Sequence, residues 1–146
     1  MMKLVEKIQY EDNLLAIILY ANYHASGITF VTPNELSQQL AYMNHPKGKV
    51  IDAHIHNPVP REVMYTQEVL FIKKGKLRVD FYDQNQHYFE SRVLTEGDTV
   101  LLVQGGHGFE VLEEIEMIEV KQGPYIGEED KTRFKGISSN QVKVEG

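Results

Sequence analysis

The chain has 146 residues, 42% of them hydrophobic and 25% charged, which is typical of one globular domain large enough to bury a core. The formal net charge of −6 argues against a nucleic-acid-binding surface, which is normally basic. The chain has no cysteine, which excludes disulfides, thiolate ligands and a cysteine nucleophile and is compatible with the cytoplasmic location that we expect.

The N-terminal part is predicted to form strands. Residues 3–10 and 14–23 are expected to be two strands joined by Glu11-Asp12-Asn13. The apolar run at residues 14–21 is too short to cross a bilayer, which takes about 20 residues, so we interpret it as a buried strand and expect no membrane association. Thr32-Pro33-Asn34-Glu35 resembles a capping box, and one helical turn is expected there, between strands at 28–31 and 38–44.

The rest of the chain continues the alternation of strands and turns. Residues 68–73 and 76–83 are predicted to form a hairpin around Lys74-Gly75, in which Leu77, Val79 and Phe81 face one side. The other expected strands are 50–57, 87–95, 99–104, 108–112 and 115–121, with a proline-rich loop at 57–60. This pattern predicts an all-β barrel or jelly roll in a single domain at residues 1–135, followed by a flexible polar tail at 136–146.

The most informative motif is His54-Ile55-His56. On a strand, both imidazoles would point to the same side about 6.6–6.8 Å apart, a distance from which they can converge on one metal ion. Glu68 and His107 are candidate partners, and three imidazoles with one carboxylate suit divalent Fe, Mn, Ni, Co or Zn. A His-x-His pair on a strand is also common without any metal, and Glu62 is a rival carboxylate.

Two longer patterns strengthen this hypothesis. Gly48 precedes the histidine pair, and Glu68 is followed after six residues by Gly75. Gly97-Asp98 is followed by an apolar run, Gly105-Gly106 and His107. Over roughly residues 48–121 the chain resembles a single-domain cupin, and the resemblance implies a jelly-roll barrel that binds one metal ion through His54, His56, Glu68 and His107. The gap between the histidine pair and Glu68 is longer than the family usually has, and Val103 and Val111 replace the motif's proline and asparagine.

Other residues are weaker candidates. Asp52 shares the predicted face of the histidine pair and is expected either to orient an imidazole or to lie at the surface. Tyr65, Arg78, Tyr82 and Gln104 are candidate substrate-binding residues, although each is also compatible with a solvated or packing role. No catalytic base beyond the metal ligands is evident.

The function inferred from these residues is that of a metal-dependent cupin acting on a small polar metabolite. Residues 121–134 resemble the ending of bacterial cupins associated with polysaccharide and nucleotide-sugar pathways, which implies a sugar derivative and an isomerase- or epimerase-like step. A dioxygenase with three histidine ligands and one glutamate, and a non-catalytic sugar- or carboxylate-binding module, are the alternatives. Apolar residues on the opposite side of the 50–57 strand also need cover, and we expect a homodimer.

Overall fold

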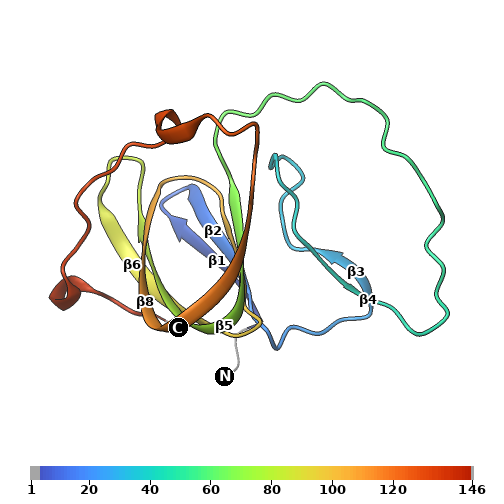
Figure 1. The fold of residues 1–146 in the computed structure, drawn as a ribbon, viewed down its shortest axis with the longest axis horizontal. Helices are drawn as coiled ribbons and strands as arrows, with labels where there is room; N and C mark the ends of the chain where they lie inside the picture. Colours follow the sequence, from blue (N-terminus) through green and yellow to red (C-terminus); the bar gives the residue numbers. More distant parts are fainter. Residues whose placement is uncertain (1–3, 146) are drawn as a thin grey trace.

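The structure is a computed structural model that describes residues 4–145, and it is built almost entirely of β-strands (Figure 1). One antiparallel sheet has the strand order β1-β2-β7-β5-β6, with β8 also paired to β5, while β3 and β4 form a separate ribbon. The strands of the large sheet are β1 (Val5–Tyr10), β2 (Asn13–Leu19), β5 (Glu68–Tyr82), β6 (Tyr88–Thr95), β7 (Thr99–Leu102) and β8 (Gly106–Lys121). The small ribbon consists of β3 (Gly27–Phe30) and β4 (Ala41–Asn44).

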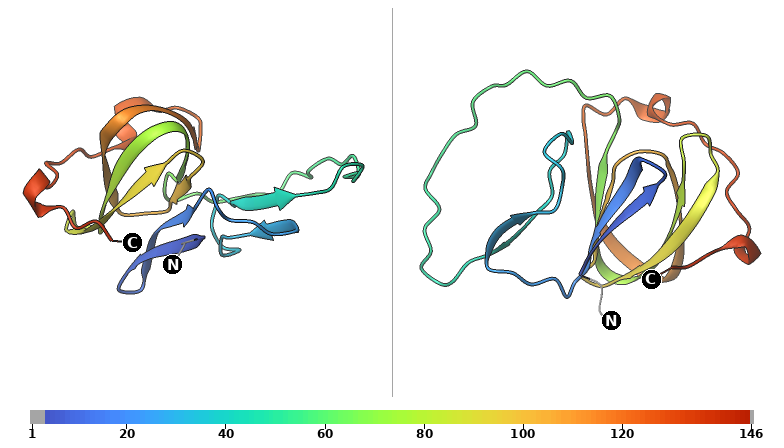
Figure 2. Two further views of the ribbon diagram at one scale, coloured as in Figure 1. Left: turned by 90° about the horizontal axis from the view of Figure 1, so that it is seen from below. Right: turned by 180° about the vertical axis from the view of Figure 1, so that it is seen from behind.

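The strand β5 organises the large sheet. Along one edge it pairs with β8 from Glu68 to Tyr82, and along the other it pairs first with β7 and then with β6. The paired β5 and β8 curl together, so the sheet bends into a half-barrel (Figures 1 and 2). The prediction of an all-β, barrel-like architecture is therefore confirmed as far as the strand content and the curled antiparallel sheet are concerned.

The interior of the half-barrel is apolar. The predicted buried strand is confirmed, because Leu15, Ala16, Ile17 and Ile18 in β2 are all buried. On β5 the alternating residues Leu77, Val79 and Phe81 are buried as the pattern predicts. Burial of a large aliphatic side chain stabilises the fold by roughly 1.5–3 kcal/mol, so this cluster contributes much of the stability.

The predicted hairpin around Gly75 is wrong. Lys74 and Gly75 lie inside one continuous strand, and β8 runs unbroken alongside it. Gly75 has φ +98°, and the register between the two strands shifts on both sides of it. A glycine with positive φ indicates a bend as readily as a turn, and here the irregular pairing produces the bend without reversing the chain.

The strand predicted at residues 50–57 is absent from the structure. Residues 46–65, which we call the arm, have no regular secondary structure, and every one of them is exposed. Val50 and Ile55 are 75% and 86% exposed, although their side chains are apolar. Figure 2 shows that β3, β4 and the arm extend to one side of the half-barrel. The predicted proline-rich loop at 57–60 is confirmed as part of the arm.

The helical turns also lie elsewhere than predicted. Residues 32–35 form an irregular turn, in which Thr32 Oγ1 donates to Gln39 Oε1 (2.7 Å) instead of capping a helix. Two short 3₁₀ turns occur in the C-terminal segment, at Gly127–Asp130 and Ser139–Gln141. The polar tail then runs beside β6, where the Ser91 N–H donates to the Lys143 carbonyl oxygen (2.7 Å).

Candidate functional site

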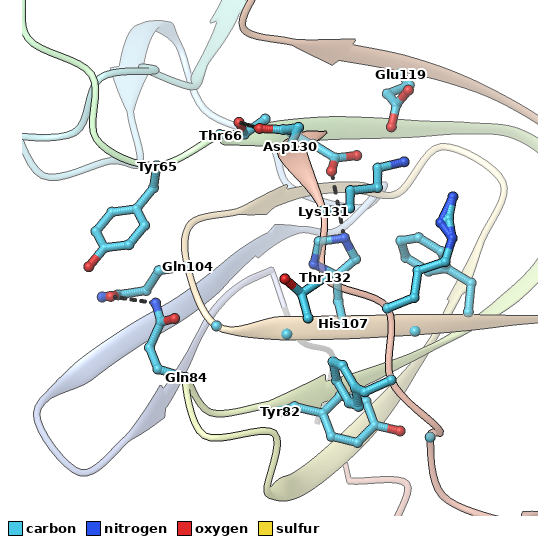
Figure 3. A pocket seen from close by; sticks show the side chains of 18 of the residues that line it. Tyr65, Thr66, Tyr82, Gln84, Gln104, His107, Glu119, Asp130, Lys131 and Thr132 are labelled. Atoms are coloured by element: carbon cyan, nitrogen blue, oxygen red, sulfur yellow. Dashed lines mark hydrogen bonds and ion pairs between the residues drawn. The ribbon is translucent and has the colours of Figure 1, made fainter. Parts of the chain in front are cut away.

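A cavity of about 710 Å³ lies between β5, β8 and the C-terminal segment (Figure 3). Its size is in the range that holds a small metabolite, which is about 300–1,000 Å³. The cavity brings together five of the residues that the sequence predicted for the site, namely Tyr65, Glu68, Tyr82, Gln104 and His107.

Glu68 and His107 form the centre of this cavity. Glu68 is the first residue of β5 and His107 the second residue of β8. The Oε1 atom of Glu68 lies 3.6 Å from Nε2 of His107, and the two side chains are 11% and 28% exposed. A carboxylate and an imidazole at this separation can both contact one cation, so the pair can serve as metal ligands, and each group can by itself take part in acid–base chemistry.

A second carboxylate changes the electrostatics of this pair. The interaction with the His107 imidazole lowers the pKa of Glu68 to about 2, against the opposing effect of burial. The neighbouring carboxyl of Glu119 has its pKa raised, chiefly by hydrogen bonding with Glu68. Of the two carboxyls, Glu68 is therefore the more readily ionised, which makes it a better ligand for a cation than Glu119.

Polar groups ring the cavity mouth. The amide of Gln84 donates to Gln104 Oε1 (3.4 Å), and Thr66 Oγ1 donates to Asp130 Oδ1 (2.6 Å), which ties the C-terminal segment to the start of β5 (Figure 3). Amides and hydroxyls at a cavity mouth can hydrogen-bond a polyhydroxylated ligand, because each offers a donor or an acceptor.

Tyr82 holds the C-terminal segment against the barrel. Its ring packs edge-to-face on Phe134 with a centroid separation of 5.0 Å. Its hydroxyl oxygen accepts a hydrogen bond from the Ile137 N–H (3.0 Å). Tyr82 is only 3% exposed, so the structure gives it a positioning role at the cavity wall.

Arg78 does not line the cavity. Its guanidinium donates from Nε and Nη2 to the carboxylate of Asp80 (2.8 and 3.0 Å) and from Nη1 to Glu110 (2.8 Å). The bidentate pair engages a carboxylate that is nearly buried, and it explains why Arg78 occupies this position.

His54, His56 and Asp52 lie on the exposed arm, and the structure does not bring them to Glu68 and His107. The two imidazole rings are 5.3 Å apart, and Nδ1 of His54 lies 2.8 Å from the backbone carbonyl oxygen of Asp52. Glu62, the rival carboxylate, is also on the arm. Within residues 4–145, no group of three or more histidine, aspartate or glutamate side chains is placed to hold a metal ion.

The sequence did not single out Gln84, Thr66 or Glu119 as site residues. Glu119 belongs to an alternating acidic strand and resembles an ordinary solvated residue. Asp130 follows two glutamates in the sequence, and its segment reaches the cavity through Phe134 and Thr66. These residues reach the cavity only because segments that are far apart in the sequence lie side by side. A single sequence does not show which distant segments are neighbours.

The chain matches no family model, no curated protein and no solved structure. Among residues 4–145 there is also no helix with the length and apolar character that a membrane span requires.

Proposed function

We propose that the chain is a metal-binding protein of the cupin type whose cavity takes a small polar metabolite, a sugar or sugar derivative, for an isomerase- or epimerase-like step. The observation that carries this proposal is the Glu68–His107 pair, at 3.6 Å, inside a cavity of about 710 Å³. A concave site that combines convergent polar groups with aromatic walls is the usual setting for such a ligand.

The donor chemistry of the cavity fits a divalent transition metal in part. Glu68 supplies an oxygen and His107 a nitrogen, which is the mixed donor set that Fe, Mn, Ni, Co and Zn accept. His54 and His56 are the further nitrogen donors that we propose, and they are accessible on the arm. A bound divalent ion would polarise a ligand carbonyl or hydroxyl in the cavity.

The chain's own residues would bind and orient the metabolite. The Gln84 and Gln104 amides would hydrogen-bond its hydroxyl groups, and Tyr65, beside them at the cavity mouth, would contact it as well (Figure 3). Phe109 and Phe134 would pack against its apolar face and reduce the access of water. Glu119 would place a second carboxyl beside Glu68 at the cavity wall.

Metal analysis of the native protein is the first test. We expect close to one divalent ion per chain, loss of that ion in Glu68→Gln, and retention of it in Glu62→Gln, the matched variant on the arm. Loss in Glu62→Gln alone would transfer the ligand role to Glu62. A metal-free native protein that also fails to take up Zn²⁺, Mn²⁺, Ni²⁺ or Fe²⁺ would contradict the metal proposal.

Ligand binding and turnover are tested separately. We expect thermal stabilisation by members of a panel of sugars and nucleotide sugars, and a change in product stereochemistry or carbonyl position measured by NMR. Oxygen uptake with an iron-loaded protein would instead identify a dioxygenase. Binding with no turnover would identify a binding module.

A further inference from the structure

We infer that the arm of a second copy of this chain pairs with the free edge of β8 and places its His54 and His56 beside Glu68 and His107, so that each site is completed by two chains. This inference rests on the proposed metal site and specifies which chain supplies the histidine pair.

The strand β8 is incompletely covered. Among the described strands it pairs with β5 alone, so its other edge presents unpaired backbone groups over 16 residues. None of its residues is buried, whereas β5 beside it is mostly buried from Leu77 to Tyr82. Val111 and Ile118 are 52% and 51% exposed. An exposed, long and apolar edge strand is a site where another chain adds a strand.

The arm has the complementary properties. Val50, Ile51 and Ile55 form an apolar set that is more than half exposed. The turn residues on either side, Pro46-Lys47-Gly48 and Asn57-Pro58, leave between them a stretch of strand length. Backbone groups of this stretch make no ladder in the structure. Pairing with β8 would satisfy both sets of backbone groups and bury both apolar sets.

Charge also favours this contact. Five glutamates lie on β8, at positions 110, 113, 114, 116 and 119, against a single lysine at its end. The arm carries Lys47, Lys49 and Arg61 against two acidic residues, Asp52 and Glu62. A segment with a small excess of positive charge is electrostatically favoured beside an acidic strand.

Geometry favours a second copy over the chain's own arm. Gln67, two residues after the arm, is 4% exposed, and its side chain accepts hydrogen bonds from Ser37 Oγ (3.2 Å) and the Gln38 N–H (3.0 Å). The ribbon of β3 and β4 is thereby fixed beside the start of β5, and the arm leaves it in the direction away from its own half-barrel (Figures 1 and 2). Exchange of identical segments between two copies closes such an assembly with two-fold symmetry.

Position 107 explains why the exchange would complete the site. His107 lies on β8, so a strand added to its free edge lies next to this residue. A strand with His54 and His56 on one face would then bring two imidazoles to the side of β8 from which His107 points into the cavity. The donor set of the cavity would rise from two side chains to four.

Subunit mixing tests this inference. One variant, Glu68→Gln/His107→Ala, lacks the barrel ligands, and the other, His54→Ala/His56→Ala, lacks the arm ligands; each alone is expected to bind no metal. When the two are unfolded together, refolded and given Zn²⁺, arm exchange restores about a quarter of the wild-type metal content, because half of the dimers are mixed and one of their two sites is intact. No restoration, with wild-type protein binding metal normally, would overturn the inference and leave the proposed function standing.

Cross-linking provides a readout that does not depend on metal, since the chain has no native cysteine. A chain carrying both Ile55→Cys and Gly108→Cys is expected to form disulfide-linked dimers under mild oxidation, seen on non-reducing gels, because a strand with His54 and His56 beside His107 places Ile55 next to Gly108 on the opposite face. Asp12→Cys with Ile55→Cys is the matched control, because Asp12 lies in the exposed turn between β1 and β2. A disulfide confined to one chain, at monomer mass, would overturn the exchange; linked dimers from a protein that binds no metal would uphold it and refute the proposed metal site.

Discussion

Glu68 and His107 lie at opposite ends of the paired strands β5 and β8, yet their side-chain atoms are 3.6 Å apart. Along the ladder, Glu68 is opposite Lys121 and His107 is opposite Phe81. The two residues meet because both strands bend near Gly75, so that the first part of the pair faces the last part across the cavity. The bend is therefore a requirement for the site.

Gly75→Ala is expected to destabilise the protein by about 3 kcal/mol or more. The residue has φ +98°, and an added Cβ would lie 2.1 Å from the backbone carbonyl oxygen of Glu114, which cannot move without breaking the bend. Chemical denaturation measures the effect. Gly48→Ala is the control, because its φ is +90° with nothing within 4 Å, and it is expected to cost about 1 kcal/mol. Equal losses in the two variants would show that the contact with Glu114 is unimportant.

Arg92→Met is expected to destabilise the fold by about 3 kcal/mol, because it removes the guanidinium that pairs with two carboxylates in a partly buried position. The Arg92 side chain is 7% exposed, and its Nη2 donates to Glu6 and to Glu90, both at 2.9 Å. Thermal and urea denaturation check this value. Arg133→Met removes an exposed ion pair with Glu128 and is expected to change stability by less than about 0.5 kcal/mol. A loss of similar size in both variants would contradict the argument from burial.

Phe134→Ala is expected to release the C-terminal segment from the cavity and to lower stability by about 2 kcal/mol. The ring packs on Tyr82 and lies so close to Gly106 that an added Cβ there would be 3.0 Å from Phe134 Cζ. Trypsin should then cleave faster at Lys131 and Arg133. Tyr125→Ala serves for comparison, since that ring is 80% exposed and its removal should leave the cleavage rate unchanged. An unaltered rate in Phe134→Ala would show that other contacts hold the segment.

Glu119→Gln is expected to stabilise the metal-free protein at neutral pH but not in acid. A carboxyl whose pKa is raised on folding opposes stability as the pH rises above its unfolded value, and Glu119 is such a group. The gain should appear above about pH 4.5 and stay below about 0.5 kcal/mol, because Glu119 is exposed and screened by solvent. Glu68 has the opposite sign: its pKa falls from 4.5 to about 2, so its contribution is lost as the pH falls through that interval.

Melting temperatures of wild type and Glu119→Gln between pH 3 and pH 8, in the presence of a chelator, check this prediction. A difference between the two proteins that is constant over the whole range would contradict it, because a constant difference does not arise from proton binding.

Much of the sheet follows from local sequence. The apolar residues of β2 and the alternation in β5 predicted strands and their buried faces, because burial has the period of the pleat. The continuity of β5 and β8 through residue 75 was not predictable in this way, since a glycine after a lysine is compatible with a turn or a bend. The difference depends on the neighbouring strand, whose Glu114 is distant in the sequence.

In the site, too, some features were predictable from the sequence and others depend on residues that are distant in the chain. The motifs and the resemblance to cupins put Glu68 and His107 in one predicted site, and in the structure their side chains lie 3.6 Å apart. The role of Arg78 was not predictable, because its partner Glu110 lies 32 residues away and an alternating charged strand does not show which acid it meets. The histidine pair was expected on a strand, but in the structure it lies on the exposed arm, which pairs with no strand among the described residues.

The shared path of β5 and β8 limits how this protein can vary in length. A residue inserted in one of the two strands would displace every later cross-strand neighbour and turn inward-facing side chains outward, unless the other strand gained a residue at the same level. Insertions and deletions are therefore expected in the turn between β5 and β6 and in residues 46–65, while these two strands lengthen or shorten only as a pair.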